Sequence, residues 1–494
     1  MILTAIVLCP LLGALVMGTV GHRKGADALN VLFSFLTFGL SIVLAFLVFT
    51  GGAVTGGAEQ LYSDGFSAIF VVITGGVGAT TSLFSLRYMA IEKARGHLGA
   101  ERTRLYLTLY QVFILTMLVV LVSNNLGILW VSLEGATLAT VLLVAWTRTP
   151  ASVKAAWKYF ILCGVGIALA LFGTILLYFA SEKTLGPGGT ALLWTHLNGV
   201  KTTLEPTVIG LAFIFFIVGY GTKVGLVPLH SWLPDAHAEG PTPISAVLSG
   251  LLLNVALYAI LRIKVLADGS LHNHLTSRLL LGFGLVSVLL ASLSMWRRQD
   301  IKRLFAYSSI EHMGLATFAF GLGGPVGAFA GLLHMTSHSL IKSAIFFVVG
   351  HVVQTSGSQK IPDIRHIGER TPALARALTI GGLAITGLPP FAIFASEFLI
   401  LSTAVVRAPW ALPPLLLALL ITFGVVFRRI QEMTSGPSAS GGPALPSSSS
   451  PPVLTFYPVW IHFGLALVIG LFFPESLGRL YHSALLSIGL TNGQ

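Results

Sequence analysis

Charged residues are scarce in this chain of 494 residues. Asp, Glu, Lys and Arg together make up 10% of it, whereas 54% of the residues are hydrophobic. Soluble domains usually carry about 25% charged residues. No long polar stretch that could fold as a soluble catalytic domain interrupts the apolar runs. The composition therefore predicts an all-α polytopic membrane protein, in which each span needs about 20 apolar residues.

Cysteine is equally scarce. The chain has 2 cysteines, Cys9 and Cys163, and both lie within apolar runs. They cannot form a CxxC metal site or an iron–sulfur ligand set, so we interpret them as small packing residues. The sequence also lacks a catalytic triad, a phosphate-binding loop and a metal-cluster pattern. We therefore expect no cofactor in this chain and assign any enzyme activity to an assembly that contains it.

The net charge of +11 does not indicate nucleic-acid binding, because the basic residues lie in short loops between apolar runs. The first run lacks a basic start and a small-residue cleavage site, so we interpret it as a retained span and not as a signal peptide. The fourteen candidate spans are at about 2–20, 29–49, 65–86, 105–122, 126–147, 156–180, 207–231, 241–266, 279–296, 304–321, 325–353, 373–401, 410–430 and 453–473.

The loops between these spans predict the topology. Most of the 29 lysines and arginines follow odd-numbered spans. By the positive-inside rule, both termini then lie on the non-cytoplasmic side of a cell inner membrane. The run 325–353 is long for one span and is expected to tilt or bend. The low-complexity segment within 433–452 cannot bury a core and is expected to be a flexible loop.

Four charged residues interrupt the apolar runs. They are Glu134, Lys223, Lys342 and Glu397. A charge at the centre of a span costs about 2.5–3.5 kcal/mol, so such residues usually face the bundle interior and pair with one another. Structural ion pairs are one interpretation. The other is an ion pathway, because burial favours the neutral forms of Lys and Glu and so lets both exchange protons near neutral pH.

Histidines accompany one of these charges. His334, His338 and Lys342 are four residues apart and so lie along one helix face. This pattern fits a proton relay or satisfied core histidines; a metal site would need a third ligand that the span does not supply. His230, His237 and His312 are weaker candidates near span ends, of which His230 and His237 flank a helix break.

Helix-breaking residues surround the charges. Gly219, Gly221, Gly225 and Pro228 lie around Lys223, and Gly387, Pro389 and Pro390 precede Glu397. Unwound backbone at membrane depth survives only where it is buried in protein or lines a cavity. The interrupted spans are the seventh and the twelfth. Because they are five positions apart, an odd number, they cross the membrane in opposite directions, which predicts two inverted five-helix repeats. The expected divisions are 1–104 (helices 1–3), 105–266 (helices 4–8), 267–432 (helices 9–13), 433–452 (the loop) and 453–494 (helix 14 and tail).

Several long stretches resemble a known family. KVGLVPLHSWLPDAHAEGPTPISAVLSGLLLNVALYAILR, at 223–262, resembles the antiporter-like subunits of respiratory complex I and of the Mrp cation/proton antiporters. WVSLEGATLATVLLVAW, DIKRLFAYSSIEHMGLATFAFGLGG and HMTSHSLIKSAIFFVVGHVVQTSGSQ look like the hydrogenase-4 component F branch. The resemblance runs from about residue 60 to 430 and implies a fourteen-helix core with two inverted repeats.

The resemblance also implies roles for individual residues. Glu134 and Lys223 would form the charge pair of the first half-channel, Glu397 would be the terminal charge of the second, and His334, His338 and Lys342 would lie on the polar axis between them. Many relatives carry a lysine where this chain has Asn254, which cannot carry a proton as a charge, so Asn254 is either a relay position that holds water or a gap. Some relatives have Lys where this chain has Glu397. The absence of a long lateral helix after the last span favours a component F or middle-subunit type.

The function implied is proton translocation, or sodium translocation in some members, coupled to redox chemistry in partner membrane subunits. The main hypothesis is a subunit of a hydrogenase-4 or formate hydrogenlyase-type complex, with the redox cofactors in its partners. Alternatives are a subunit of an Mrp-like sodium/proton antiporter or of a complex I-type NADH:quinone oxidoreductase. A membrane scaffold that has lost transport is a third hypothesis, which the intramembrane charges disfavour.

Overall fold

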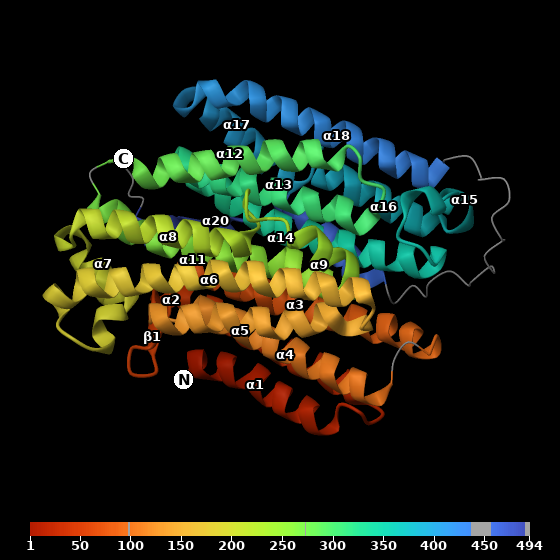
Figure 1. Ribbon diagram of the computed structural model, residues 1–494, viewed down its shortest axis with the longest axis horizontal. Helices are drawn as coiled ribbons and strands as arrows, with labels where there is room; N and C mark the ends of the chain where they lie inside the picture. Colours follow the sequence, from red (N-terminus) through yellow and green to blue (C-terminus); the bar gives the residue numbers. More distant parts are fainter. Residues whose placement is uncertain (97–98, 272, 436–455, 490–494) are drawn as a thin grey trace.

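A computed structural model describes residues 1–96, 99–271, 273–435 and 456–489, and most of them are helical. The helices run roughly along one common axis and form a bundle (Figure 1). The first half contains α1 (Ile2–Val20), α2 (Ala26–Gly51), β1 (Val54–Gly56), β2 (Leu61–Ser63), α3 (Gly65–Ala94), α4 (Ala100–Val122), α5 (Leu126–Val144), α6 (Pro150–Leu185), α7 (Trp194–Val200), α8 (Pro206–Val224), α9 (Leu233–Glu239), α10 (Thr242–Val247) and α11 (Leu253–Ser270). The second half contains α12 (Leu275–Met295), α13 (Ile301–Leu322), α14 (Gly324–Ser356), α15 (Ile367–Arg370), α16 (Pro372–Ile385), α17 (Ala392–Arg407), α18 (Leu412–Ser435), α19 (Tyr457–Phe472) and α20 (Glu475–Ser487).

The predicted all-α membrane architecture is confirmed. Within the described residues, 11 helices are long and apolar enough to cross a membrane, and up to 12 if the bent pair α19–α20 counts as one span. The helix α13 and the interrupted pair α16–α17 occupy the predicted tenth and twelfth spans but are not among those 11. The total of fourteen spans therefore stays a prediction.

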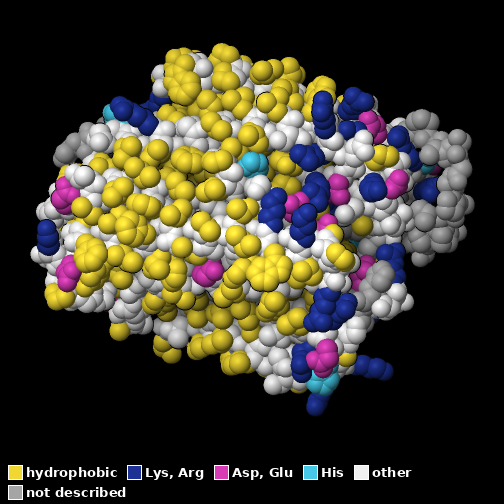
Figure 2. All heavy atoms as spheres, in the orientation of Figure 1, with side chains coloured by type: hydrophobic (Ala, Val, Ile, Leu, Met, Phe, Trp, Pro, Cys, Tyr) yellow, Lys and Arg dark blue, Asp and Glu magenta, His cyan; other side chains and the backbone are white. Residues whose placement is uncertain are grey.

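The two ends of the bundle differ in charge. The start of α1 packs against the β1–β2 hairpin and α20 packs against the start of α3, so both lie at one end of the bundle. In the view of Figure 2, hydrophobic side chains cover the middle of the molecule, and most visible lysines and arginines gather at the opposite end. This distribution is the one that the positive-inside rule requires of loops on the cytoplasmic side.

Both predicted helix breaks are present. The helix α8 ends at Val224, where Gly225 takes a left-handed conformation with φ +83°, and α9 begins only at Leu233. The helix α16 ends at Ile385, and Gly387 has φ +70° before α17 begins. A left-handed turn is open to glycine without a steric penalty. Each break also contains the expected prolines, Pro228 in the first and Pro389 and Pro390 in the second, whereas Gly221 lies inside α8.

Glycines bring the interrupted helix α8 close to α6. A Cβ atom added to Gly219 would lie 2.6 Å from the Gly166 carbonyl oxygen, and one added to Gly166 would lie 2.7 Å from Thr222. Small residues allow such close approach of helix backbones within membranes. In the second half, Gly284 of α12 and Gly314 of α13 pack in the same way. The crossing of α6 and α8 fixes the position of Lys223 at the end of α8.

Three features lie outside the sequence-based expectations. The β1–β2 hairpin and the terminal helix α20 did not follow from hydrophobic periodicity, because the hairpin is short and α20 is amphipathic. The predicted loop at 433–452 begins inside α18, which continues to Ser435, and its remainder lies outside the described residues.

Candidate functional site

The two charges of the first half lie together. Lys223, in the last turn of α8, has its Nζ 3.5 Å from Oε2 of Glu134 in α5. The Lys223 side chain is 0% exposed and that of Glu134 is 23% exposed. Neither atom has a hydrogen-bond partner in the described protein. The pair is therefore a loose ion contact, in which a small movement of either helix would change the distance between the charges.

The polar face of α14 lies inside the bundle. His334, His338 and Lys342 are all fully buried. The Lys342 ammonium donates a hydrogen bond to the Phe305 carbonyl oxygen at 3.0 Å and lies 5.6 Å from the centroid of the Phe305 ring. Both ring nitrogens of His338 lack a hydrogen-bond partner in the described protein. The predicted common face is thus confirmed, and it carries buried groups free to accept new hydrogen bonds.

A hydrogen-bonded chain leads from α14 towards the second break. His334 Nε2 lies 3.1 Å from Nδ1 of His312, and His334 Nδ1 lies 2.9 Å from the Ser396 hydroxyl. His312 Nδ1 is also 4.0 Å from Oε1 of Glu397 in α17. Because a neutral imidazole donates from one nitrogen and accepts at the other, His334 can pass a proton between His312 and Ser396 by changing tautomers.

His312 occupies a different place from the one that the sequence indicated. It lies in the middle of α13 and not near the end of a span. It contacts both His334 of α14, 22 positions away in the sequence, and Glu397 of α17. Its role could not be inferred from spacing, because the helices it joins are brought together only by the fold.

Glu311, beside His312, is a buried acid that the sequence analysis did not single out. Its side chain is 0% exposed and accepts a hydrogen bond from the Thr422 hydroxyl of α18 at 2.7 Å. The signal that could have found it is the same one that identified Glu134, a carboxylate inside an apolar run.

Asn254 lies directly beside the polar face of α14. Its amide nitrogen donates to the Ser339 hydroxyl at 2.7 Å and to the carbonyl oxygens of Met335 and Gly250 at 3.2 Å. Its amide oxygen is buried without a hydrogen-bond partner in the described protein. Asn254 therefore ties α11 to α14 next to His338 and keeps one free acceptor there.

The two histidines that flank the first break lie in different environments. His237 is fully buried and stacks on Phe346 of α14, with ring centroids 4.9 Å apart. Phe346 is one helical turn beyond Lys342, so His237 lies next to the polar face. His230 is only partly buried, and its ring centroid is 6.4 Å from that of Tyr307.

At the basic end of the bundle, charged side chains from predicted loops contact α9. Lys302, in the first turn of α13, is 5% exposed and donates to the carbonyl oxygens of Ala238 and Gly240 at 3.0 and 2.6 Å. A lysine suits these groups because the end of a helix leaves carbonyl oxygens unpaired and attracts a positive charge. Asp235 of α9 pairs with Lys158 at 2.8 Å and with Arg303 at 2.5 Å.

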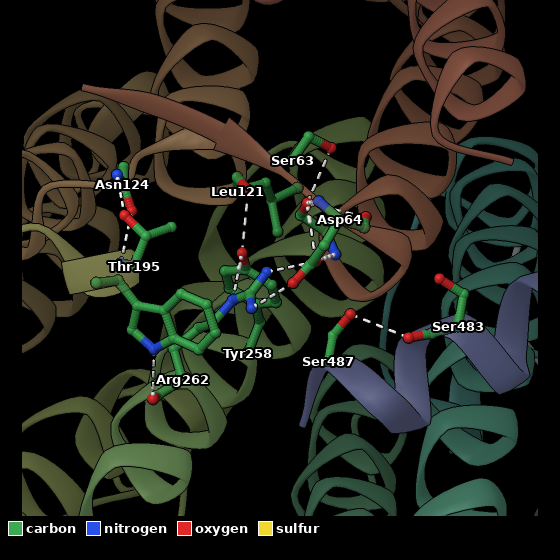
Figure 3. A network of polar contacts seen from close by, with 11 residues as sticks. Ser63, Asp64, Leu121, Asn124, Thr195, Tyr258, Arg262, Ser483 and Ser487 are labelled. Atoms are coloured by element: carbon green, nitrogen blue, oxygen red, sulfur yellow. Dashed lines mark hydrogen bonds and ion pairs between the residues drawn. The ribbon is translucent and has the colours of Figure 1, made fainter. Parts of the chain in front are cut away.

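A second buried ion pair closes the other end of the bundle. Arg262 of α11 binds both carboxylate oxygens of Asp64, the N-cap of α3, at 2.7 and 2.6 Å. Figure 3 shows these side chains converging with Tyr258, and in the same view Asn124, between α4 and α5, contacts Thr195 of α7. The guanidinium also lies 4.5 Å from the Trp194 ring centroid.

The charge of Asp64 depends on this partner. Burial alone would raise the pKa of Asp64, but the guanidinium of Arg262 and the backbone amide of Ser67 lower it below its ordinary value. The carboxylate is therefore ionised at neutral pH and the pair is held by charge-assisted hydrogen bonds.

No group of three or more His, Cys, Asp or Glu side chains that could hold a metal ion occurs in the part of the chain that the structure describes. The two nitrogens of His334 are engaged by His312 and Ser396. Hydrogen bonds thus engage both ring nitrogens of His334 and, in the described protein, neither ring nitrogen of His338.

Comparisons with known proteins identify the family of this chain. The family model described as "NADH:quinone oxidoreductase/Mrp antiporter, TM" matches residues 123–424. The chain is 47% identical to the "Hydrogenase-4 component F homolog" of Methylacidiphilum infernorum, over 95% of this chain and 96% of that one. It superposes on a chain of the membrane-bound sulfane sulfur reductase, an archaeal respiratory membrane complex, with a TM-score of 0.86 and 25% identity, covering 99% of this chain and 98% of that one.

The fold is shared more widely still. A chain of the Mrp complex from Dietzia sp. DQ12-45-1b gives a TM-score of 0.82 at 18% identity, with 99% of this chain and 98% of that one covered. At this identity the likeness concerns the fold alone. The matched family region includes both helix breaks and the charges beside them, and the protein belongs to the NADH:quinone oxidoreductase/Mrp antiporter transmembrane family.

Proposed function

We propose that this protein is a proton-translocating membrane subunit of a redox-driven complex. The observation that supports this proposal is the series of buried and half-buried ionisable side chains that lies between the two helix breaks. It runs from the Glu134–Lys223 pair past His237 to the polar face of α14, and through His312 to Glu397. Buried ionisable groups are expensive inside a membrane and mark ion pathways.

The loose Glu134–Lys223 contact is the proposed control point. When a conformational change brings Glu134 closer, its charge favours protonated Lys223; when Glu134 moves away, burial favours release of the proton. The released proton moves along His338, His334 and His312 to Glu397. Each unit charge moved against 100 mV requires about 2.3 kcal/mol, which rearrangement of a single buried ion pair can supply.

The assembly that we infer is of the hydrogenase-4 or formate hydrogenlyase type, in a cell inner membrane with both termini on the non-cytoplasmic side. The 47% identity to a hydrogenase-4 component F homolog supports this choice. The redox cofactors then belong to partner membrane subunits. An Mrp-like sodium/proton antiporter is the second candidate, supported by the shared fold with a chain of an Mrp complex.

The proposal is tested with the intact complex in sealed membrane vesicles. Lys223→Ala and Glu134→Gln should lower redox-driven proton uptake by about 100-fold or more, the usual contribution of a positioned proton-transfer group. Electron transfer should continue when an uncoupler is present. The matched controls are Lys154→Ala and Glu101→Gln, which change exposed residues.

Two outcomes would overturn parts of this proposal. Full proton uptake by both Lys223→Ala and Glu134→Gln would rule out the pair as the control point. Proton movement that requires sodium and proceeds without any electron donor would favour the antiporter.

A further inference from the structure

A long apolar groove lies on the outside of the bundle, away from the residues of the proposed proton pathway. It has a volume of about 610 Å³, and its walls come from α2, α3, α14, α19 and α20. The wall residues Ile42, Phe46 and Leu465 are 49%, 63% and 48% exposed. The groove is therefore open along its length to whatever surrounds the protein, which at this level is the hydrocarbon of the membrane.

The groove is as long as one leaflet is thick. Along α2 it extends from Phe49, near the end of the helix, to Phe38 at its middle, and along α3 from Ile69 to Thr80. At 1.5 Å per residue, both distances are about 16 Å. The hydrocarbon core of a bilayer is about 30 Å thick, so the groove covers the leaflet on the side of the β1–β2 hairpin and ends at the middle of the membrane.

The inner end of the groove is closed by a polar contact between helices. The Thr80 hydroxyl lies 2.8 Å from Nε2 of His462, whose Nδ1 lies 3.1 Å from the Leu340 carbonyl oxygen. A transmembrane helix of a partner subunit would cross both leaflets, whereas this groove stops after one. Its length and closed end fit an acyl chain better than a helix.

A positively charged side chain, that of Arg479, lies at the open end of the groove. The α20 helix is bent 83° from α19 and so runs across the end of the bundle. Its apolar side contributes Leu477 and Leu480 to the groove, and the Arg479 guanidinium lies 5.1 Å from the centroid of the Phe49 ring at the groove mouth. The Arg479 side chain is 65% exposed, and its contact with Glu475 is weak, at 4.0 Å.

The position of α20 is fixed by the helices beneath it. The Tyr481 hydroxyl lies 2.5 Å from the Thr336 hydroxyl of α14. Ser483 packs onto Gly65, the first residue of α3, where a Cβ atom would meet its hydroxyl at 2.5 Å. Arg479 is thus held at the membrane surface, the level at which phospholipid phosphates lie.

We propose that this groove is a phospholipid-binding site that takes one acyl chain along α2 and α3 and the headgroup phosphate at Arg479. An apolar channel with a single charged group at its mouth has the composition expected of such a site. Guanidinium groups bind phosphate oxygens through paired hydrogen bonds. The site is independent of the proposed proton transport, because none of its residues belongs to that pathway.

The test uses the full-length protein, stripped of lipid in detergent and titrated with phosphatidylglycerol while bound lipid is counted by native mass spectrometry. Ala45→Trp places a large ring inside the groove and should abolish the bound lipid. Arg479→Gln should weaken binding by about fivefold, the usual effect of one basic residue near an anionic headgroup. The matched controls are Val43→Trp, on the exposed side of α2 beyond the groove, and Arg278→Gln, an exposed arginine on α12.

Each outcome decides the proposal. Loss of binding in Ala45→Trp and weakening in Arg479→Gln, with both controls unchanged, would support it. Equal binding by all variants would overturn it. The intact complex is also treated with phosphatidylglycerol that carries a photoreactive acyl chain: labelled peptides from α2, α3 and α19 support the lipid site. If the label is found only in other segments and Phe46 can be cross-linked to a partner subunit, a protein segment occupies the groove. That result would overturn the proposal.

Discussion

At the scale of single residues, most charges inside this bundle have partners on other helices. Arg262 and Asp64 form a paired contact between α11 and the start of α3, and Lys302 closes the end of α9. Lys223 and Glu134 are different, because their charges are 3.5 Å apart and have no further hydrogen bond in the described protein. Tight pairs hold the structure, and the loose pair is the one suited to change during function.

Asp64→Asn should destabilise the protein strongly, because it leaves the Arg262 charge buried without its counter-ion. Breaking a buried pair in this way costs about 3–5 kcal/mol. The measurement is the free energy of unfolding in detergent. Glu101→Gln is the control, since it removes an exposed carboxylate that pairs with Arg104 at 2.6 Å and should cost at most about 1 kcal/mol. Equal losses in both variants would contradict the assigned role of the Asp64–Arg262 pair.

The same pair predicts a pH dependence. Because the pKa of Asp64 is lower in the folded protein than in the unfolded chain, its contribution to stability is complete above the unfolded-state pKa of about 3.9. That contribution is lost as the pH falls through the folded-state value. The stability difference between the wild type and Asp64→Asn should therefore be constant from pH 7 to 5 and shrink in stronger acid. A difference that grew on acidification would refute this assignment.

At the scale of elements, the two interrupted helices place charges beside unwound backbone. Gly387 takes φ +70°, and the Glu397 carboxylate packs directly against it, where a Cβ atom would collide. In the first break, a Cβ atom on Gly225 would meet the Leu233 side chain at 2.7 Å. Each break thus depends on a glycine both for its backbone conformation and for the space that a neighbouring side chain fills.

Gly387→Ala should therefore destabilise the break and displace Glu397. The left-handed conformation alone costs a non-glycine residue about 1–3 kcal/mol, and the collision with the carboxylate adds to that. Thermal unfolding and proton uptake in vesicles would both be measured. The control is Gly424→Ala in the interior of α18, where an added Cβ atom meets nothing within 4 Å and helix propensity improves by about 1 kcal/mol. Proton uptake that stayed normal in Gly387→Ala would separate Glu397 from transport.

At the scale of the whole molecule, charge is sorted between the two ends of the bundle. Loops rich in lysine and arginine gather at one end, whereas the start of α1 and the helix α20 lie at the other. The apolar surface between them matches the hydrocarbon of a bilayer. By the positive-inside rule, the end of the bundle with the basic loops is expected on the cytoplasmic side of the membrane.

Labelling of single cysteines would measure this orientation. In a background with Cys9 and Cys163 replaced by Ser, we expect Asn273→Cys, between α11 and α12, to react with a membrane-impermeant maleimide on right-side-out vesicles. His22→Cys, between α1 and α2, should react only after the vesicles are opened. Both positions are exposed, so they form a matched pair. The reverse pattern would invert the proposed topology.

Much of the fold and part of the site could be predicted from the sequence. Apolar runs located most of the helices, and Pro228, Pro389 and Pro390 located both breaks. Charges inside those runs identified Glu134 and Lys223, which the structure places in contact. Arg262 and Lys302 could not be assigned, because a charge near the end of a span looks the same whether it points to water or to a buried partner.

The sequence by itself determined that this protein is a helical membrane bundle with interrupted helices and buried charges, because hydrophobicity and helix-breaking residues act locally along the chain. The family resemblance implied the Glu134–Lys223 pair, but only the tertiary structure decided which other charges meet. The contacts between His312 and Glu397 and between Asp64 and Arg262 join segments far apart in the sequence. Such pairings depend on helix packing, which is set by glycine crossings and side-chain shape throughout the bundle and leaves no local signature in the chain.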